Sequence, residues 1–311
     1  MTLVRLRLAA VVAAVALAAF LAVGLVAAHG YVDNFLAYRG FDPPRDPAFV
    51  AHPGALERVA VPSPALGGRR QEAYVYLPAA YAQQPRRRFP VLYLLHGFPG
   101  RPLAFLLTVR MGVVEDALVA EHQAQPLILV MPFGSTGTFT DKEWANGLGR
   151  SEDWRTFVSR DVVRAIDANY RTIASRTARG IGGLSEGGYG AINIALHAPK
   201  EFSLVESWSG YEVAVHNHSI FGRELTGLAP NTPLDGLRVS ASVLRRLHTY
   251  FWVYTGKNDS LRRENRAFAS ELTAAGIPHT YLELRGGHNW ALWRGMAWRS
   301  YLVASRRLSH D

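Results

Sequence analysis

The stretch from Ala178 to Gly190 constrains the fold of this chain more than any other. It contains Gly183-Leu184-Ser185-Glu186-Gly187, a G-x-S-x-G pattern in which the serine sits on a strained turn between a strand and a helix. Side chains two positions before and after the serine would collide with such a turn, so glycine is needed there. Ala178 to Gly182 is consistent with a buried strand, and Tyr189 to His197 with a helix. Because a chain with 28 glycines can carry this pattern by chance, residues elsewhere must decide its meaning.

Apolar runs and helix-like segments alternate along the rest of the chain. Strands are expected at Leu56–Val61, Gln71–Leu77, Pro90–Leu95, Pro126–Met131, Phe202–Trp208, Thr249–Tyr254 and His279–Leu284. Helices are expected at Leu103–Ala120, Asp153–Tyr170, Leu261–Ala275 and Trp290–Leu308. The first two strands are close enough to form an antiparallel hairpin, whereas the later alternation predicts an α/β fold with a doubly wound, mostly parallel sheet and helices on both faces. Residues 132–151 and 209–239 are expected to be long irregular connections.

The N-terminal part has the composition of a targeting segment. Residues 8–28 carry no charge and follow Arg5 and Arg7, so they are long enough to cross a bilayer with the preceding end in the cytoplasm. The remainder is therefore expected outside the cytoplasm, either membrane-anchored or secreted after cleavage near Ala28. The expected organisation is a signal anchor or signal peptide at residues 1–28, an irregular tether at 29–55 and a folded domain at 56–311.

Composition excludes several kinds of chemistry. The chain has no cysteine, so disulfides, thiol catalysis and cysteine-bound metals are excluded. Its net charge of +9 comes mainly from scattered arginines without interleaved aromatic residues, so nucleic acid is not an expected partner. His216 and His218 have no convincing third ligand nearby in the sequence, and neither a metal nor a cofactor is expected.

Three polar residues follow expected strands, where ligands bind in open α/β sheets: Ser185, Asp259 and His288. A serine hydroxyl needs a base to accept its proton during attack, and imidazole titrates in the useful range. We expect His288 to be that base and Asp259 to hold its productive tautomer. Glu264 and Glu283 are weaker candidates for the acid, because one falls in an expected helix and the other in an expected strand.

The oxyanion of such a reaction needs two preorganised donors. One is the backbone N–H of Glu186, directly after the serine, and the other is the N–H of Phe98, in the loop after the Leu92–Leu95 strand. Both are chosen by position, so their side chains need no chemical role. His96 is interpreted as a residue that shapes this turn. The alternative role for Asp259 is to cap the following helix.

Together, these segments resemble the putative esterase family of α/β-hydrolases. The resemblance is carried by Tyr74-Val75-Tyr76-Leu77-Pro78, Leu95-His96-Gly97-Phe98-Pro99-Gly100, Gly183–Gly190 and Gly286-Gly287-His288-Asn289-Trp290 with Trp293-Arg294. That family includes esterase D-type S-formylglutathione hydrolases, feruloyl and enterobactin esterases and the antigen 85 mycolyltransferases. The resemblance spans roughly residues 56–308. It implies a triad of Ser185, Asp259 and His288, with oxyanion amides at Phe98 and Glu186.

The expected function is hydrolysis of a carboxylic ester through an acyl-enzyme on Ser185. An acyltransferase of the antigen 85 type is the first alternative, because Val61–Gly67 is similar to the opening of that branch. Two positions differ from that branch: His96-Gly97 replaces Asp-Gly, and Asp259 replaces glutamate. The second alternative is a non-catalytic envelope-binding protein of the same fold.

The expected substrate is an ester or acyl lipid, and residues 8–28 would place the protein on a membrane if they remain uncleaved. Five aromatic residues could line an apolar acyl site, with core packing as the alternative: Phe139, Trp144, Trp208, Tyr211 and Phe221. The sequence patterns leave the identity of the acyl chain and of the leaving group open.

Overall fold

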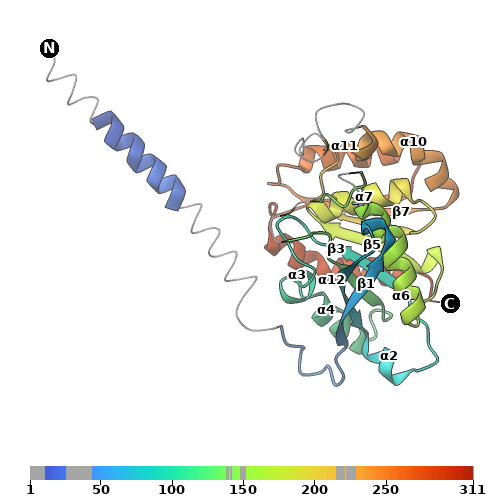
Figure 1. The fold of residues 1–311 in the computed structure, drawn as a ribbon. Helices are drawn as coiled ribbons and strands as arrows, with labels where there is room; N and C mark the ends of the chain where they lie inside the picture. Colours follow the sequence, from blue (N-terminus) through green and yellow to red (C-terminus); the bar gives the residue numbers. More distant parts are fainter. Residues whose placement is uncertain are drawn as a thin grey trace, which may run out of the picture. The chain divides into compact units, whose positions relative to one another are not determined.

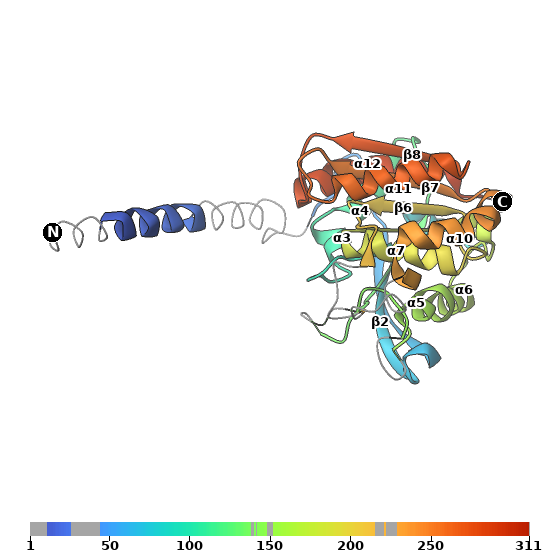
Figure 2. The same cartoon turned by 90° about the horizontal axis from the view of Figure 1, so that it is seen from above.

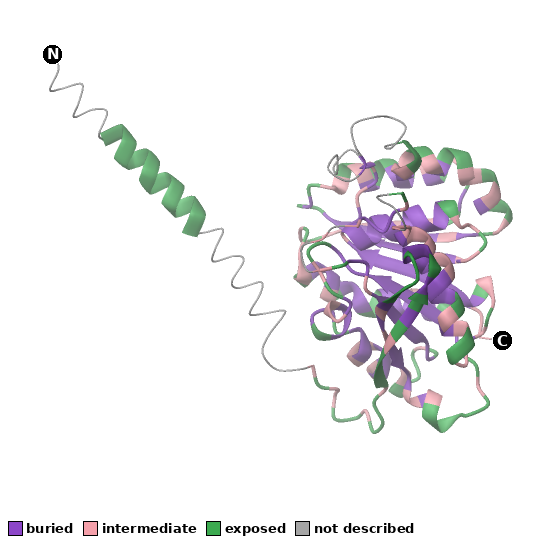
Figure 3. Ribbon diagram, in the orientation of Figure 1, coloured by how far each residue is buried: buried purple, intermediate pink, exposed green. Residues whose placement is uncertain are grey.

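The computed structural model describes residues 11–25, 44–137, 140, 142–147, 152–214, 221 and 229–310. The chain divides into two units, Met1–Pro43 and Pro44–Asp311. In the first unit, residues 11–25 form a helix with exposed side chains (Figure 3). Residues 8–10 and 26–28 of the expected apolar segment lie outside the described residues. Within the described part of the chain, no helix has both the length and the apolar character needed to span a membrane.

Eight strands in the second unit form one sheet in the order β1-β2-β4-β3-β5-β6-β7-β8 (Figure 1). The strands are β1 Ala55–Ser63, β2 Arg69–Leu77, β3 Val91–Leu95, β4 Ile128–Pro132, β5 Arg179–Leu184, β6 Leu204–Trp208, β7 Tyr250–Gly256 and β8 His279–Leu284. β1 and β2 form the antiparallel hairpin, and β2 also pairs antiparallel with β4. The other strand pairs are parallel, and Figure 2 shows β6, β7 and β8 side by side. The expected mostly parallel sheet is confirmed.

Helices cover both faces of this sheet (Figure 1). The α-helices are α2 Ala79–Gln83, α3 Ala104–Leu107, α4 Met111–Ala120, α5 Trp154–Thr156, α6 Val163–Asn169, α7 Glu186–His197, α10 Pro233–Arg246, α11 Arg262–Ala274 and α12 Trp290–Arg307. The π-helical stretch η2, Phe157–Val162, joins α5 to α6, and the short 3-10 turns are η1 Pro64–Leu66, η3 Arg176–Ala178 and η5 Ala229–Asn231. The expected helix at Asp153–Tyr170 is therefore present with a π-helical middle.

The strand period of two divides the apolar side chains between two cores. On β3, Val91, Tyr93 and Leu95 face a core with side chains from α6, α7, α10 and α11. Leu92 and Leu94 face the opposite core, with side chains from α4 and α12. Because both faces of the central strands are buried, these strands are continuous apolar runs, as expected for a parallel sheet covered on both sides.

Two expected elements differ from the structure. The single helix expected at Leu103–Ala120 is two helices, α3 and α4, because Arg110 adopts a left-handed φ of 66° that interrupts the helix. The irregular connection expected to extend to Val239 ends earlier, because α10 begins at Pro233. The sequence signals for this helix are Pro233 at the first helical position and the two leucines Leu237 and Leu244, which are spaced two turns apart. Both leucines are buried in the structure.

Glu206 is a fully buried carboxyl in the core between β6 and α12. Its Oε2 accepts hydrogen bonds from Trp208 Nε1, at 3.1 Å, and from the Ser300 hydroxyl. Burial raises the pKa of Glu206 from its ordinary value of 4.5 to about 8. Between these two pH values the folded chain retains a proton that the unfolded chain has released. The contribution of Glu206 to the free energy of unfolding is therefore fully present below pH 4.5 and is lost as the pH rises through about 8.

We therefore expect Glu206→Gln, which mimics the protonated side chain, to flatten the pH dependence of the free energy of unfolding. At about pH 8 the variant should be more stable than the wild type by on the order of a few kcal/mol, as measured by urea denaturation across pH 5 to 8. Glu121→Gln, at an exposed glutamate, is the control and should leave the profile unchanged. An unaltered pH slope in Glu206→Gln would show that the buried carboxyl does not titrate in this range.

Candidate active site

Ser185 occupies a sharp turn between β5 and α7. Its φ of 55° and ψ of −123° place it in a strained conformation that non-glycine residues rarely adopt. The turn is held on both sides: the Ser185 N–H donates to the Trp208 carbonyl at 2.9 Å, and the Ser185 carbonyl accepts from the Gly188 N–H at 2.9 Å. The backbone thus presents the Ser185 hydroxyl at the carboxyl end of β5, next to the first turn of α7.

The two glycines of the motif are explained by close backbone contacts. A Cβ on Gly183 would lie 2.3 Å from the Gly187 carbonyl oxygen. A Cβ on Gly187 would lie 1.8 Å from the carbonyl oxygen of Leu95, at the end of the neighbouring strand. Neither distance leaves room for a side chain. The G-x-S-x-G spacing is therefore a packing requirement where β5, α7 and β3 meet.

The loops after β7 and β8 are joined to each other by backbone hydrogen bonds. The Lys257 N–H donates to the Leu284 carbonyl at 2.7 Å, and the Asn258 N–H donates to the Gly286 carbonyl at 2.9 Å. A Cβ on Gly256 would lie 2.5 Å from the Gly286 carbonyl oxygen, so glycine at 256 permits this approach. The two loops carry Asp259 and His288, and their pairing brings these residues together.

The side chains of Ser185, His288 and Asp259 form a continuous chain of polar contacts. Ser185 Oγ lies 2.9 Å from His288 Nε2, and His288 Nδ1 lies 3.0 Å from Asp259 Oδ2. The Asp259 side chain is completely buried, whereas that of His288 is 33% exposed. The geometry puts a hydroxyl, an imidazole and a carboxylate in series, with the hydroxyl end facing solvent.

The environment of Asp259 favours its charged form. Burial alone would raise the pKa of Asp259, but the hydrogen bonds with His288 and from the Leu261 N–H, at 2.9 Å, outweigh it and hold the pKa below the ordinary value. The alternative that Asp259 caps the following helix is wrong, because the N-cap residue of α11 is Leu261 and no side chain caps that helix; the contact with the Leu261 N–H lies in the turn before it. One carboxyl thus starts the turn before α11 through Oδ1 and contacts the imidazole through Oδ2.

The other acids considered from the sequence have different contacts. Glu283 lies on β8 and binds Arg266 through two hydrogen bonds of 2.8 Å. Glu264 lies on α11 and accepts the Glu212 N–H at 3.0 Å. Among the acids considered, Asp259 is the one within hydrogen-bond distance of His288.

Aromatic side chains surround one side of the imidazole. The ring of His288 meets Trp293 edge-on, with centroids 5.0 Å apart, and Trp293 meets Trp290 in the same way at 5.0 Å. The Asn289 side chain accepts the Leu292 N–H at 3.1 Å and so caps α12 next to this cluster. The cluster fixes the orientation of the imidazole from the α12 side.

The loop after β3 lies against the serine. A Cβ on Gly97 would be 3.0 Å from Ser185 Cβ, so the backbone of this loop passes directly beside the nucleophile candidate. The N–H of Phe98 has no acceptor within the described ranges, and its side chain is 42% exposed. Glu186 is the first residue of α7, whose N-terminus carries a partial positive charge. Glu186 thus directly follows Ser185 in the chain, and Gly97, the residue before Phe98, lies beside Ser185 in space.

The aromatic residues considered for an acyl site have mixed positions. Trp144 and Trp208 are fully buried, and Trp208 packs between Phe105 and Tyr254, so core packing accounts for both tryptophans. Tyr211 stacks on Tyr189 with centroids 4.5 Å apart, and Phe221 packs near the same ring at 6.2 Å. Phe139 lies outside the described residues.

The structure also bears on a metal site. Over the described ranges, no three or more histidine, aspartate or glutamate side chains converge as metal ligands. His216 and His218 lie outside these ranges. The polar groups at the carboxyl end of the sheet are instead arranged as the hydroxyl, imidazole and carboxylate series.

Comparison with known proteins identifies the family. The family model described as Putative esterase matches residues 63–297, a region that includes Ser185, Asp259 and His288. The chain belongs to this family. The resemblance seen in the sequence motifs is thereby confirmed, and an ester-hydrolysing enzyme is the function class that this membership supports.

Two curated relatives that this chain resembles are named as esterases. The chain is 31% identical over 183 residues to an endo-1,4-beta-xylanase/feruloyl esterase of Xylanibacter ruminicola, covering 56% of this chain and 25% of the relative. It is 29% identical over 242 residues to an esterase of Mycobacterium tuberculosis, covering 69% of this chain and 51% of the relative. The chain thus spans about half or less of the length of these relatives.

Solved structures show the same fold. A ferulic acid esterase superposes with a TM-score of 0.71 at 24% identity, covering 82% of this chain and all of that chain. An S-formylglutathione hydrolase from Agrobacterium tumefaciens superposes with a TM-score of 0.69 at 17% identity, covering 86% of this chain and 99% of that chain. The α/β-hydrolase fold expected from the sequence is confirmed.

Proposed function

We propose that this chain is a serine esterase that hydrolyses carboxylic esters through an acyl-enzyme on Ser185. The observation that carries the proposal is the continuous contact from Ser185 Oγ through the His288 imidazole to the buried Asp259 carboxylate, at 2.9 and 3.0 Å. This arrangement supplies a nucleophile, a base and a group that holds the base in the productive tautomer. Family membership and the names of the relatives agree with this reaction.

In the first half of the reaction, Ser185 Oγ attacks the ester carbonyl carbon while His288 Nε2 takes the hydroxyl proton. The carbonyl oxygen becomes an oxyanion, to which the Phe98 and Glu186 N–H groups would donate; each such donor is worth roughly 10² to 10³ in rate. When the carbonyl re-forms, the bond to the alcohol oxygen breaks and the imidazolium gives its proton to the leaving alcohol. The acyl group remains on Ser185.

In the second half, water takes the place of the alcohol. It attacks the acyl carbon and gives a proton to His288, and the collapse of the second oxyanion releases the free acid and restores the Ser185 hydroxyl. The buried, charged Asp259 stabilises the imidazolium that forms in each half. The acyltransferase alternative differs only here, because a sugar or lipid hydroxyl would take the place of water.

The direct test is covalent capture of the serine. A fluorophosphonate probe should label the folded protein at Ser185, with fluoride as the leaving group, and mass spectrometry of the tryptic peptide identifies the modified residue. Incubation with a p-nitrophenyl ester should release free acid in water, and supplying trehalose as acceptor should not divert the acyl group. Absence of labelling in folded protein would support the non-catalytic alternative instead.

We also propose that the catalytic domain works outside the cytoplasm. The proposal is supported by the uncharged residues 8–28 that follow Arg5 and Arg7. Alkaline phosphatase, which needs disulfides formed outside the cytoplasm, is expected to be active in Escherichia coli when fused after residue 55. A fusion that starts at residue 29 is the matched control, and equal activity of the two fusions would contradict the proposal.

A further inference from the structure

We infer that His96 and Trp144 are positioning residues that set the orientation of the Gly97–Phe98 peptide, and hence aim the Phe98 N–H at the oxyanion. The inference rests on the proposed function, since it concerns how the second oxyanion donor is held. It assigns roles to two buried side chains that do not touch the substrate. His96 is 3% exposed and Trp144 is completely buried.

The first step is the protonation of the His96 ring. The Gly134 N–H points at His96 Nε2, 3.1 Å away, so this nitrogen must accept and carries no proton. The proton of the neutral ring therefore lies on Nδ1, which donates to the Gly97 carbonyl oxygen at 3.0 Å. Burial lowers the pKa of His96 to about 4, so the ring keeps this neutral form in the pH range of ester hydrolysis.

The second step follows from peptide geometry. The Gly97 carbonyl and the Phe98 N–H belong to one planar trans peptide, in which the C=O and the N–H point in opposite directions. When His96 Nδ1 holds the carbonyl, it also holds the N–H pointing away from the His96 ring. This N–H has no acceptor among the described residues, and the Gly97 backbone lies directly beside Ser185. A flipped peptide would aim the carbonyl oxygen where the oxyanion needs a donor.

The third step is the support of His96 itself. Trp144 Nε1 donates to the His96 carbonyl at 3.1 Å, and the two rings meet edge-on with centroids 4.9 Å apart. Trp144 is also wedged between two glycines: a Cβ on Gly134 would lie 2.4 Å from its ring, and a Cβ on Gly190 would lie 2.7 Å from its Cβ. Gly190 belongs to α7, the helix that follows Ser185. The Trp144 side chain therefore contacts α7, Gly134, whose N–H donates to His96, and the backbone carbonyl of His96.

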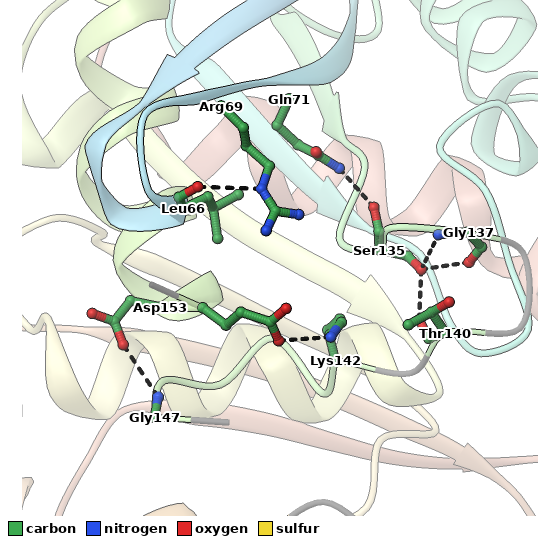
Figure 4. Close-up of polar contacts among 10 residues, drawn as sticks. Leu66, Arg69, Gln71, Ser135, Gly137, Thr140, Lys142, Gly147 and Asp153 are labelled. Atoms are coloured by element: carbon green, nitrogen blue, oxygen red, sulfur yellow. Dashed lines mark hydrogen bonds and ion pairs between the residues drawn. The ribbon is translucent and has the colours of Figure 1, made fainter. Parts of the chain in front are cut away.

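The segment that carries Trp144 is fastened at both ends (Figure 4). Towards its start, Gln71 of β2 donates to the Ser135 carbonyl at 2.7 Å, and the Ser135 hydroxyl donates to the Thr140 carbonyl at 2.5 Å. Across the segment, Lys142 pairs with Glu152 at 2.6 Å. These contacts hold Trp144 in a loop whose residues 143 and 144 both have left-handed φ values, of 50° and 48°.

The first experiment compares two substitutions of His96. His96→Leu removes the donor to the Gly97 carbonyl and should lower kcat for p-nitrophenyl acetate by about 10² or more, with KM nearly unchanged. His96→Asn can place an amide N–H near the position of Nδ1 and should recover most of that loss. Affinity for a boronic acid, whose tetrahedral adduct on Ser185 mimics the oxyanion, should fall in parallel with kcat.

The second experiment tests Trp144 and has a matched control in the neighbouring helix. Trp144→Phe removes the indole N–H and should lower kcat by about 10-fold at constant KM. Trp154 is equally buried, but its Nε1 has no hydrogen-bond partner in the described part of the chain. Trp154→Phe therefore removes about as much packing as Trp144→Phe but breaks no hydrogen bond of the indole N–H. We expect Trp154→Phe to melt at a lower temperature with kcat unchanged.

The outcomes separate this inference from the proposed function. If folded His96→Leu and Trp144→Phe keep wild-type kcat and boronic acid affinity while fluorophosphonate still labels Ser185, the positioning roles are wrong and the esterase proposal stands. Equal losses of kcat in Trp144→Phe and Trp154→Phe would show that Trp144 acts only through packing, and its positioning role would be wrong. If His96→Leu does not fold, the comparison of Trp144→Phe with Trp154→Phe still decides the question.

Discussion

Ser185→Ala is expected to lower kcat for p-nitrophenyl ester hydrolysis by on the order of 10⁶, because no other group can form the acyl-enzyme. Removing the hydroxyl leaves the β5–α7 turn intact, since its hydrogen bonds run through the Ser185 backbone. Thermal melting should therefore stay near that of the wild type, and KM should change little. Steady-state kinetics, with circular dichroism as the folding check, measures both effects.

A serine in another part of the molecule provides the control for this substitution. Ser240 lies on α10, and its hydroxyl donates to the Leu196 carbonyl at 2.9 Å. Ser240→Ala should leave kcat within about two-fold of the wild type, since it removes one hydrogen bond remote from the imidazole. If Ser185→Ala retains a substantial fraction of wild-type turnover, the acyl-enzyme mechanism is incorrect.

Asp259→Asn should have the second largest effect, a fall in kcat of about 10⁴ at neutral pH. The structure fixes the orientation of the new amide, because the Leu261 N–H needs an acceptor at the Oδ1 position. The amide NH₂ then faces His288 Nδ1, which must accept, and the imidazole proton moves to Nε2. That nitrogen can no longer take the proton of Ser185.

The acid on the neighbouring strand gives a matched comparison. Glu283→Gln removes a charge of the same sign, but Glu283 contacts Arg266 and Tyr281 rather than the imidazole. Its kcat should remain within about two-fold of the wild type. A large loss in Glu283→Gln together with an active Asp259→Asn would reassign the acid.

The sequence was sufficient to predict the parts of the site that lie at strand ends. Ser185, Asp259 and His288 each follow a strand, and parallel strands end at one edge of a sheet, so their approach could be expected before any coordinates. The need for glycine around Ser185 could also be predicted on steric grounds. The short distances from a Cβ at Gly183 or Gly187 to neighbouring carbonyl oxygens agree with that prediction. Local patterns were therefore informative wherever a strand ended in a short loop.

Other features depend on contacts that no local pattern contains. The sequence predicts that His96 shapes its turn, but its partners Gly134 and Trp144 lie 38 and 48 residues later, in a loop that lacks periodicity. The break at Arg110 depends on a backbone angle that sequence patterns do not reveal. The helix α10 was missed because turn-like residues before Pro233 concealed its start.

The backbone hydrogen bonds between the loops after β7 and β8 have a consequence for redesign. The N–H groups of Lys257 and Asn258 donate to the carbonyls of Leu284 and Gly286. A displacement of one loop therefore also displaces the other. An engineer who wishes to alter what this protein accepts should leave both of these turns at their present length. Insertions and exchanged sequence are better placed in other loops at this edge of the sheet, where a change in shape need not alter the contact between Asp259 and His288.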